Sequence, residues 1–190
     1  MPVLGAELLA EAERIKVRYP EGRERSAILP LLYLAQSVEG RVTREGLKEV
    51  ADLLGIRTAE VEAVASFYTM LRLRPTGRYV ISVCTNLPCA LRGAKELYRE
   101  AHDVLGPGCE HATEDGLFTL HEEECLGACD AAPVVQVNFA NYDRISKERL
   151  VEMIDALRRD DPPPPSRGAF PGDFRQASRI LAGLEPEGDA

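Results

Sequence analysis

The sequence lacks any long apolar run, and none approaches the roughly 18 residues that a membrane-spanning helix needs. It also lacks an excess of positive charge, since 31 acidic residues against 23 basic ones give a net charge of −8. A nucleic-acid-binding protein is expected to carry a basic face, so this charge argues against such a partner. We therefore expect neither a membrane span on this chain nor a nucleic-acid partner.

Residues 1–14 lack the positively charged start and apolar core of a secretory signal, because acidic residues interrupt the stretch MPVLGAELLAEAER. We therefore expect the protein to stay in the reducing cytoplasm. In that compartment, grouped cysteines indicate metal or redox chemistry more often than structural disulfides. The five cysteines of this chain are candidates for such chemistry.

Several nucleotide and redox motifs are also missing. No G-x-G-x-x-G follows a predicted strand and no P-loop is present, so we do not expect the chain alone to bind NADH or a flavin. No C-x-x-C pair is present, which argues against a thiol–disulfide enzyme. We expect no catalytic residue on this chain.

Residues 1–75 carry apolar side chains at helical spacing and predict a small helical bundle. Ser26, Thr43 and Thr58 stand where they can cap the starts of successive helices. The third and fourth predicted helices could pass for a DNA-binding helix-turn-helix. However, residues 43–75 hold five basic and five acidic residues, and a neutral pair of helices is a poor reader of DNA.

The pattern changes after Pro75 to an alternation of strands and helices. This order is α+β and is compatible with a thioredoxin-like layer over residues 76–159. The predicted elements are a strand at 78–84, a helix from 88 to about 101, strands at 116–121 and 134–138, a turn at 141–143 that opens a fourth strand, and a helix capped by Ser146.

Residues 160–190 are rich in proline, with six of the 13 prolines of the chain, and predict an extended C-terminal tail. Phe170, Phe174 and Leu181 give this tail apolar surface to bury. We therefore favour an arm that docks on a partner protein, and the alternative is plain disorder.

Four cysteines form two pairs, C-T-N-L-P-C and C-L-G-A-C. In a thioredoxin-like layer, both loops can emerge at the same edge of the sheet, where the four thiolates would converge. Thiolates select zinc, copper(I) or iron–sulfur clusters. Structural zinc sites often use C-x2-C, whereas these wider spacings suit a 2Fe-2S cluster in which each pair binds one iron. Spacing alone favours the cluster and leaves zinc and redox thiols open.

The remaining candidate ligands do not fit this pattern. Cys109 has no partner at ligand spacing, so we interpret it as a spare thiol. His102, His111 and His121 show no C-x-H spacing, which argues against a Rieske site. We expect these histidines to be solvated or to lie behind the ligands.

Three stretches together carry a resemblance: VADLLGIRTAEVEAVASFYTML, VCTNLPC and DGLFTLHEEECLGACDAAP. Over about residues 5–160 the chain resembles the thioredoxin-like 2Fe-2S subunit of NADH:quinone oxidoreductase, respiratory complex I. The resemblance implies a helical N-terminal domain at 1–75, a thioredoxin-like 2Fe-2S ferredoxin domain at 76–159, and one 2Fe-2S cluster. The implied cofactor and metal ligands are Cys84, Cys89, Cys125 and Cys129.

The resemblance also implies an electron-transfer role in an oxidoreductase and translocase. The partner would be the NADH-binding subunit, which would carry the FMN and exchange single electrons with this chain, alongside further iron–sulfur subunits of the peripheral arm. The complex would hold the chain on the cytoplasmic side of the plasma membrane. Two alternatives stay open: the equivalent subunit of an NAD-linked hydrogenase or formate dehydrogenase, and a zinc-stabilised interaction module.

Two local expectations follow from the same region. The acidic residues around the second pair, Glu122 to Glu124 and Asp130, should disfavour the extra electron of a reduced cluster and lower its potential. In thioredoxin-like folds the residue before the third strand is often a cis-proline, and A-A-P-V-V-Q-V resembles that position. We therefore expect a cis bond between Ala132 and Pro133.

Overall fold

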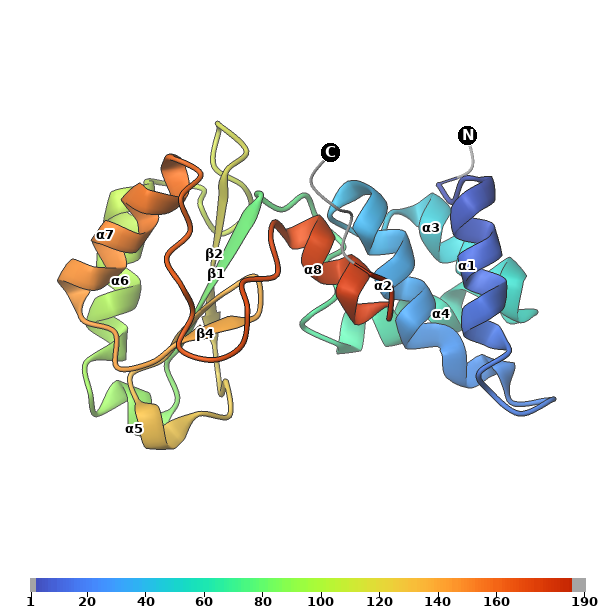
Figure 1. Cartoon of the computed structure of the whole chain (residues 1–190), viewed down its shortest axis with the longest axis horizontal. Helices are drawn as coiled ribbons and strands as arrows, with labels where there is room; N and C mark the ends of the chain where they lie inside the picture. The colour runs from blue at the N-terminus through green and yellow to red at the C-terminus, as the bar shows by residue number, and fades with distance from the viewer. Residues whose placement is uncertain (1–2, 186–190) are drawn as a thin grey trace. The chain divides into compact units, whose positions relative to one another are not determined.

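The computed structural model describes residues 3–185 (Figure 1). These residues form two compact units. The helical unit consists of the described residues up to Pro75 and those from Arg175 onward, and the sheet unit spans Thr76–Phe174. Within residues 3–185, no helix combines the length and apolarity that spanning a bilayer requires. The mixed α+β class that the sequence predicts is confirmed.

The helical unit buries the apolar faces of its helices in one core, which includes Ile15, Leu31 and Val50. Short loops connect successive helices, and α2 contacts α1, α3 and α4. Its elements are α1 (Ala6–Lys16), the 3-10 turn η1 (Glu24–Ala27), α2 (Ile28–Glu39), α3 (Arg44–Leu54), α4 (Thr58–Phe67) and the C-terminal α8 (Phe174–Leu181).

Of the three residues predicted to cap helices in this unit, Ser26, Thr43 and Thr58, one is confirmed as a cap. Thr43 caps α3, since its hydroxyl accepts a hydrogen bond from the Gly46 N–H at 3.2 Å. Ser26 instead lies inside the 3-10 turn η1, and Ala27 precedes α2. Arg57 rather than Thr58 is the residue before α4, where the Glu60 carboxylate accepts the Arg57 N–H at 3.3 Å. Thus, Thr58 is the first helical residue rather than the cap.

The sheet unit contains a four-stranded sheet in the order β2-β1-β3-β4. Strand β1 pairs with β2 in parallel and with β3 antiparallel, and β3 pairs antiparallel with β4. Helices α6 and α7 pack against each other and lie side by side next to the sheet in Figure 1. The elements are β1 (Tyr79–Cys84), α5 (Leu87–Ala90), α6 (Ala94–Leu105), β2 (Phe118–Glu123), the 3-10 turn η2 (Cys129–Ala131), β3 (Val135–Val137), β4 (Ala140–Tyr142) and α7 (Lys147–Arg158).

Three details of this unit bear on the sequence predictions. The single helix expected from residue 88 to about 101 is two helices, because Gly93 adopts a left-handed φ of 85° between α5 and α6. The turn that opens the fourth strand precedes β4, at Asn138 and Phe139, which both have positive φ. The bond between Ala132 and Pro133 is cis, as expected.

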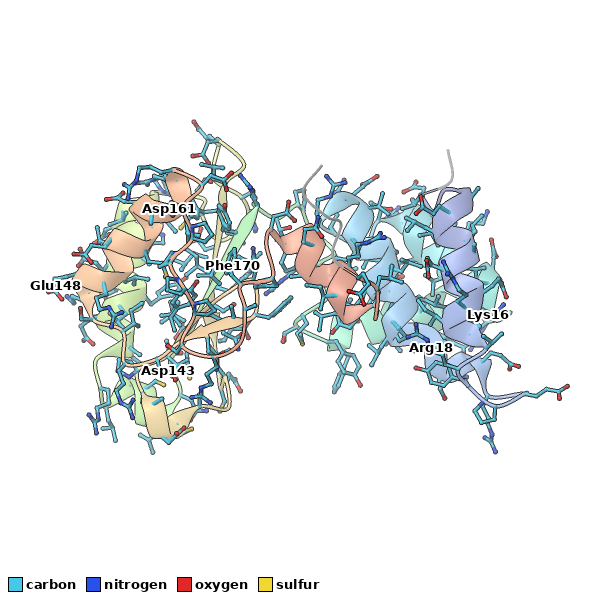
Figure 2. The ribbon with its side chains drawn as sticks, in the orientation of Figure 1. Lys16, Arg18, Asp143, Glu148, Asp161 and Phe170 are labelled. Atoms are coloured by element: carbon cyan, nitrogen blue, oxygen red, sulfur yellow. The ribbon has the colours of Figure 1, made fainter. Side chains whose placement is uncertain are left out.

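Residues 160–174 pack on the sheet unit, which therefore extends beyond the predicted boundary at 159. Prolines lack an N–H but keep a carbonyl, and Pro163 O accepts a hydrogen bond from the Tyr142 hydroxyl at 2.8 Å. Ser166 N–H donates to Asn141 O at 2.7 Å. Phe170, labelled in Figure 2, lies with its ring centroid 6.4 Å from that of Tyr79.

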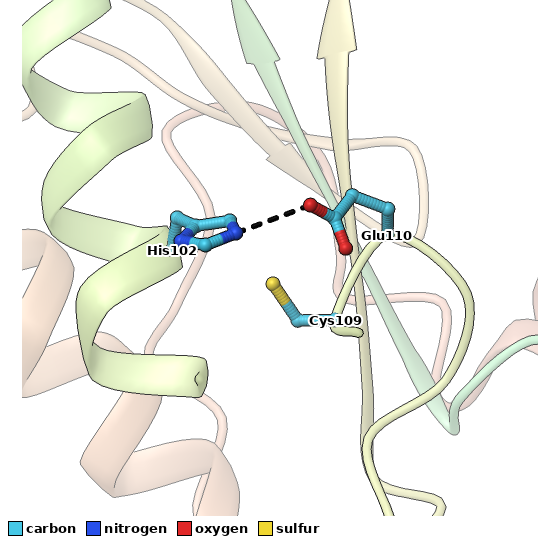
Figure 3. Close-up of side chains that lie close together, drawn as sticks. All are labelled: His102, Cys109 and Glu110. Atoms are coloured by element: carbon cyan, nitrogen blue, oxygen red, sulfur yellow. Dashed lines mark hydrogen bonds and ion pairs between the residues drawn. The ribbon is translucent and has the colours of Figure 1, made fainter. Parts of the chain in front are cut away.

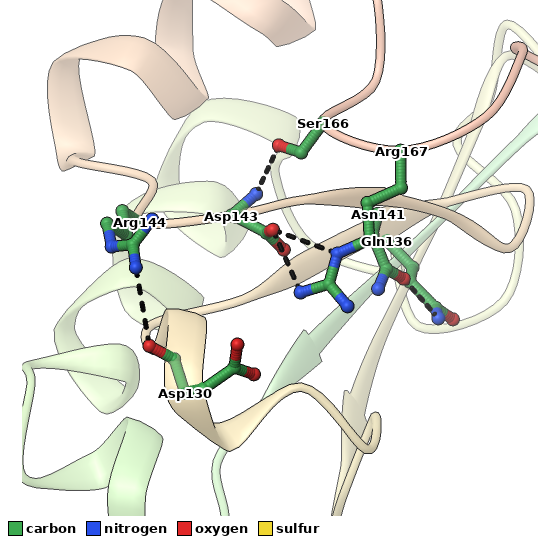
Figure 4. A network of polar contacts seen from close by, with 7 residues as sticks. All are labelled: Asp130, Gln136, Asn141, Asp143, Arg144, Ser166 and Arg167. Atoms are coloured by element: carbon green, nitrogen blue, oxygen red, sulfur yellow. Dashed lines mark hydrogen bonds and ion pairs between the residues drawn. The ribbon is translucent and has the colours of Figure 1, made fainter.

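Further polar contacts hold the same segment (Figure 4). Asp143 N–H donates to the Ser166 hydroxyl at 2.8 Å, and Arg167 donates to the Asp143 carboxylate at 2.9 and 3.1 Å. Beyond this segment, α8 packs in the helical unit, where Ser178 is fully buried. The tail therefore makes its described contacts within its own chain, and docking on a partner stays a prediction.

Candidate metal centre

The first cysteine pair lies at the end of β1 and in the short helix that follows. Cys84 is the last residue of β1 and Cys89 lies in α5, and both side chains are buried. Asn86 caps α5, since its side-chain oxygen accepts the Leu87 N–H at 2.7 Å. The turn returns the chain toward the strand, and Cys84 is close enough to act on the pKa of the Cys89 thiol.

The environment of Cys89 is apolar and crowded with sulfur. Burial raises the pKa of the Cys89 thiol to about 11, and the hydrogen bond with the Cys84 thiol is the second cause. The Val134 N–H hydrogen-bonds the Cys89 sulfur and acts in the opposite direction, because it stabilises the thiolate. Cys84 N–H in turn donates to Val134 O at 3.1 Å, so the residue after Pro133 contacts both cysteines.

The second pair lies on the loop between β2 and β3, and both of its cysteines are exposed. Gly127 lies in the turn between them. Its φ of 70° is a backbone conformation that residues with a side chain rarely adopt. Desolvation and then the charge of Cys125 raise the pKa of the Cys129 thiol. The spacing of four residues thus brings Cys125 and Cys129 close together.

The two pairs lie next to each other. Cys84 Sγ donates to the Glu124 carbonyl at 3.7 Å, the residue directly before Cys125. The charge of Cys129 acts on Cys89, and the charge of Cys84 acts on both Cys89 and Cys129. The structure therefore brings together the four cysteines that the sequence singles out, as one buried pair and one exposed pair.

This donor set fits a group of metal ions bound through sulfur. In each pair, one cysteine raises the pKa of the other. Two thiolates in the same pair therefore repel each other unless a cation lies between them. Thiolates suit zinc and iron–sulfur centres. Backbone N–H groups such as that of Val134 provide the hydrogen bonds to sulfur that tune such centres.

The surroundings of the pairs are acidic and partly apolar. The Thr85 hydroxyl donates to the Glu122 carboxylate at 2.8 Å, and Arg144 donates to the Asp130 carbonyl at 3.4 Å (Figure 4). On and after α5, Leu87 is 67% exposed and Leu91 is 77% exposed. The region thus presents large apolar side chains to solvent beside a candidate centre with two exposed sulfurs.

Cys109 is not part of this site, as the sequence predicts, but it is not isolated. Its side chain is fully buried, and burial followed by the charge of Glu110 raises the pKa of its thiol. His102 and Glu110 lie beside it. The sequence does not reveal this group, because the spacing H-x6-C-E matches no familiar ligand motif.

Comparisons with known proteins agree with this picture. A family model described as thioredoxin-like [2Fe-2S] ferredoxin matches residues 12–158. A Mycobacterium tuberculosis protein named as a subunit of NADH-quinone oxidoreductase is 49% identical over 183 residues, which cover 96% of this chain and 72% of that protein. A Rickettsia conorii protein of the same name is 43% identical over 150 residues, covering 78% of this chain and 90% of that protein.

Among solved structures, an NAD+-reducing [NiFe]-hydrogenase in its H2-reduced state matches with a TM-score of 0.62 and 23% identity. This match covers 71% of the chain and 22% of the hydrogenase chain, so it shows a likeness of fold. The family model and the two relatives cover most of the chain. The chain therefore belongs to the thioredoxin-like [2Fe-2S] ferredoxin family, whose cofactor is a 2Fe-2S cluster.

Proposed function

We propose that the four paired cysteines hold the 2Fe-2S cluster and that the chain is the electron-transfer subunit of an NADH:quinone oxidoreductase. The observation that supports this most is the arrangement of the thiols: two cysteine pairs at the ends of the neighbouring strands β1 and β2, joined by the Cys84 Sγ contact to the Glu124 carbonyl. A rhomb with two irons takes two sulfurs at each iron, and two separate pairs match that demand. The proposed ligands are Cys84, Cys89, Cys125 and Cys129.

When bound, a 2Fe-2S cluster supplies one-electron redox chemistry. NADH delivers two electrons as a hydride, so a flavin must lie between the nicotinamide and this chain. The sequence contains no dinucleotide fingerprint for either cofactor. We therefore place FMN and the NADH site on a partner subunit and assign this chain the acceptance and return of single electrons.

The exposed pair, and two exposed leucines on and after the α5 helix that carries Cys89, support a contact with that partner. Cys125 and Cys129 are open to solvent, while Leu87 and Leu91 expose most of their apolar surface. Covering such side chains removes apolar surface from water and favours association. Through this partner and the further iron–sulfur subunits, the chain would be held at the cytoplasmic side of the membrane.

Two alternatives differ in what supports them. For the equivalent subunit of an NAD-linked hydrogenase or formate dehydrogenase, the one related observation is a likeness of fold to a hydrogenase at 23% identity. The relatives at 49% and 43% identity are both named as subunits of NADH-quinone oxidoreductase, which favours the first assignment. A zinc-stabilised interaction module would require a zinc ion to replace the cluster at the same four sulfurs.

The test of the ligand set uses the full chain purified without oxygen. We expect a brown protein with about two irons per chain and the EPR signal of a reduced 2Fe-2S cluster after dithionite. Serine substitution at each proposed ligand should abolish or alter that signal. Cys109→Ser is the matched control, because it removes a cysteine outside the four and should keep the signal. A colourless protein with zinc at the four sulfurs would overturn the proposal.

The test of the role uses the chain co-expressed with the flavin subunit of an NADH:quinone oxidoreductase. NADH should then bleach the visible absorption of the 2Fe-2S cluster, whereas NADH added to the isolated chain should leave it unchanged. Reduction of the isolated chain by NADH would contradict the assignment. Bleaching by hydrogen in complex with hydrogenase subunits, and none by NADH, would favour the hydrogenase alternative.

A further inference from the structure

Three side chains outside the proposed cluster site point toward one another in the sheet unit (Figure 3). His102 lies on α6, and Cys109 and Glu110 lie on the loop that follows it. The ligand atoms of all three residues lie within 4.8 Å of one another, and His102 Nε2 is 3.1 Å from Glu110 Oε1. We call these residues the His–Cys–Glu group.

Main-chain geometry places the residues of this group. Helix α6 ends at Leu105, and Gly106 and Gly108 both adopt a φ of 85°, which turns the chain back along the helix. Leu120 N–H on β2 then donates to Cys109 O at 2.7 Å and holds the loop against the sheet. The loop geometry therefore holds Cys109 and Glu110 beside His102.

The exposure of the three side chains forms a gradient from core to solvent. Cys109 is fully buried, whereas the side chains of His102 and Glu110 are 37% and 48% exposed. A small ion can therefore approach from solvent between the imidazole and the carboxylate and reach the sulfur behind them. The Asp103 side chain, next to His102 on α6, is exposed and lies outside the group.

The donor chemistry selects the ion. An imidazole nitrogen, a thiolate sulfur and a carboxylate oxygen are together the ligand types of tetrahedral zinc, with metal–ligand distances of about 2.0–2.3 Å. Three ligands at such distances lie roughly 3–4 Å from one another, which is within the 4.8 Å that the group spans. Magnesium and calcium prefer oxygen ligands alone and do not match a buried sulfur.

We propose that His102, Cys109 and Glu110 bind a zinc ion, with a water molecule at the fourth position. The ion would replace the direct contact between His102 and Glu110 and tie the loop to α6 and, through Cys109, to β2. This site shares no residue with the four cysteines proposed for the 2Fe-2S cluster. It therefore stands whether or not the proposed function is right.

The test begins with the full chain carrying its 2Fe-2S cluster, equilibrated with zinc ions and then freed of excess zinc. Zinc K-edge X-ray absorption reports the ligands of zinc alone and is not affected by the iron. We expect one sulfur at about 2.3 Å and two or three nitrogen or oxygen ligands at about 2.0–2.1 Å. A shell of four sulfurs would place the zinc at the cluster cysteines, and a shell without sulfur would mean adventitious surface binding. Either result overturns the proposal.

Substitutions give a second, independent readout. Cys109→Ala and Glu110→Gln should each weaken zinc binding by more than about tenfold in Kd, since loss of even an outer-shell partner costs about that much. Asp103→Asn is the matched control on the same helix and should bind zinc as the parent does. Glu110 is partly exposed, so its variant is expected to fold even if a change at buried Cys109 disturbs the core. Unchanged affinity in Glu110→Gln and Cys109→Ala would refute the site.

Zinc should also stabilise the sheet unit, because an ion that binds the folded form shifts unfolding by mass action. The thermal unfolding midpoint of the parent and of Asp103→Asn should rise with zinc concentration. The midpoint of Glu110→Gln should not respond over the same range. An equal rise in all three proteins would show that zinc acts elsewhere and would overturn the proposal.

Discussion

Cys84 and Glu123 face each other across parallel strands β1 and β2, each as the last residue of its strand. Because parallel strands end at the same edge of a sheet, the segments leading to Cys89 and Cys125 start from neighbouring points. Strand register therefore brings together two pairs of cysteines that are distant in sequence. A register shift by one residue would turn every side chain of β2 to the other face of the sheet. It would also disrupt the arrangement that brings the two cysteine pairs together.

The acidic residues before the exposed pair should lower the potential of the proposed cluster, because reduction adds negative charge beside them. Replacing Glu123 and Glu124 by Gln is expected to raise the potential by on the order of tens of millivolts, given solvent screening at the end of β2. Redox titration followed by EPR measures the shift. Glu114→Gln removes one carboxylate from the exposed loop before β2 and serves as the control. An unchanged or lowered potential in the double variant would count against the electrostatic argument.

Gly77 leaves no room for a side chain. A Cβ at this position would lie 2.5 Å from the Phe118 backbone, and the Gly77 N–H also donates to the Thr119 hydroxyl at 2.7 Å. Gly77→Ala must push β2 away from the segment before β1, so we expect a loss of about 1–3 kcal/mol in the free energy of unfolding. Chemical denaturation measures this loss. Gly5→Ala is the control, since a Cβ there meets nothing within 4 Å. Equal stability of the two variants would contradict the close approach.

Alkaline pH should destabilise the sheet unit through its buried tyrosines. Burial raises the pKa of Tyr142 to about 12, and burial followed by the Asp160 hydrogen bond raises the pKa of Tyr79 to about 12. Each phenol keeps its proton in the folded state while the unfolded chain loses it near pH 10, so folding stability should fall as the pH rises from about 10 to 12.

Tyr142→Phe tests this dependence. The variant should lose about 1 kcal/mol at neutral pH, because the hydrogen bond to Pro163 O is gone. It should also show a shallower loss of stability between about pH 10 and 12 than the parent. Thermal unfolding across this range gives the slope. Tyr68→Phe, at a partly exposed position in the helical unit, is the control, and a parental slope in Tyr142→Phe would disprove the role of this phenol.

Gln36 is the polar centre of the helical unit. Its side chain is fully buried and donates to Met70 O and Ser178 Oγ at 3.1 Å each, while it accepts the Arg72 N–H at 2.6 Å. Gln36→Leu would leave several buried polar groups without their partner, so we expect a loss of about 2–4 kcal/mol in unfolding free energy. Ser178→Ala removes one of these bonds and should cost about 1 kcal/mol.

Ser66→Ala provides the matched control for these two variants. The Ser66 hydroxyl also donates to a carbonyl, that of Ala63 at 3.1 Å, but the residue is exposed on α4. Water can replace that bond, so the change should be small. If Gln36→Leu proved as stable as Ser66→Ala, the buried network would not be a determinant of stability.

Sequence patterns predicted the elements that depend on local chemistry. Helical periodicity and the Thr43 cap identified α3, and the β-branched run at 78–84 identified β1. The two cysteine pairs were identified from spacing, because short loops keep nearby residues together whatever the fold.

Other features depend on contacts that local patterns do not contain. The break at Gly93 follows from a backbone angle rather than from composition. The His–Cys–Glu group needs two glycines with positive φ to bring Glu110 back to His102, and the sequence shows glycines without their angles. The contacts of residues 160–174 use carbonyls and a serine hydroxyl that any loop could offer, so a proline-rich composition could not reveal them.

The helical unit is assembled from both ends of the described chain, with the sheet unit inserted between Pro75 and Arg175. During synthesis, Gln36 leaves the ribosome 142 residues ahead of its partner Ser178. At translation rates of about 5–20 residues per second, that interval is roughly 7–30 s. The sheet unit, which ends at Phe174, is synthesised within this interval, and throughout it the Gln36 side chain lacks its bond to Ser178. The unit whose synthesis begins first is thus the last to receive all of its residues.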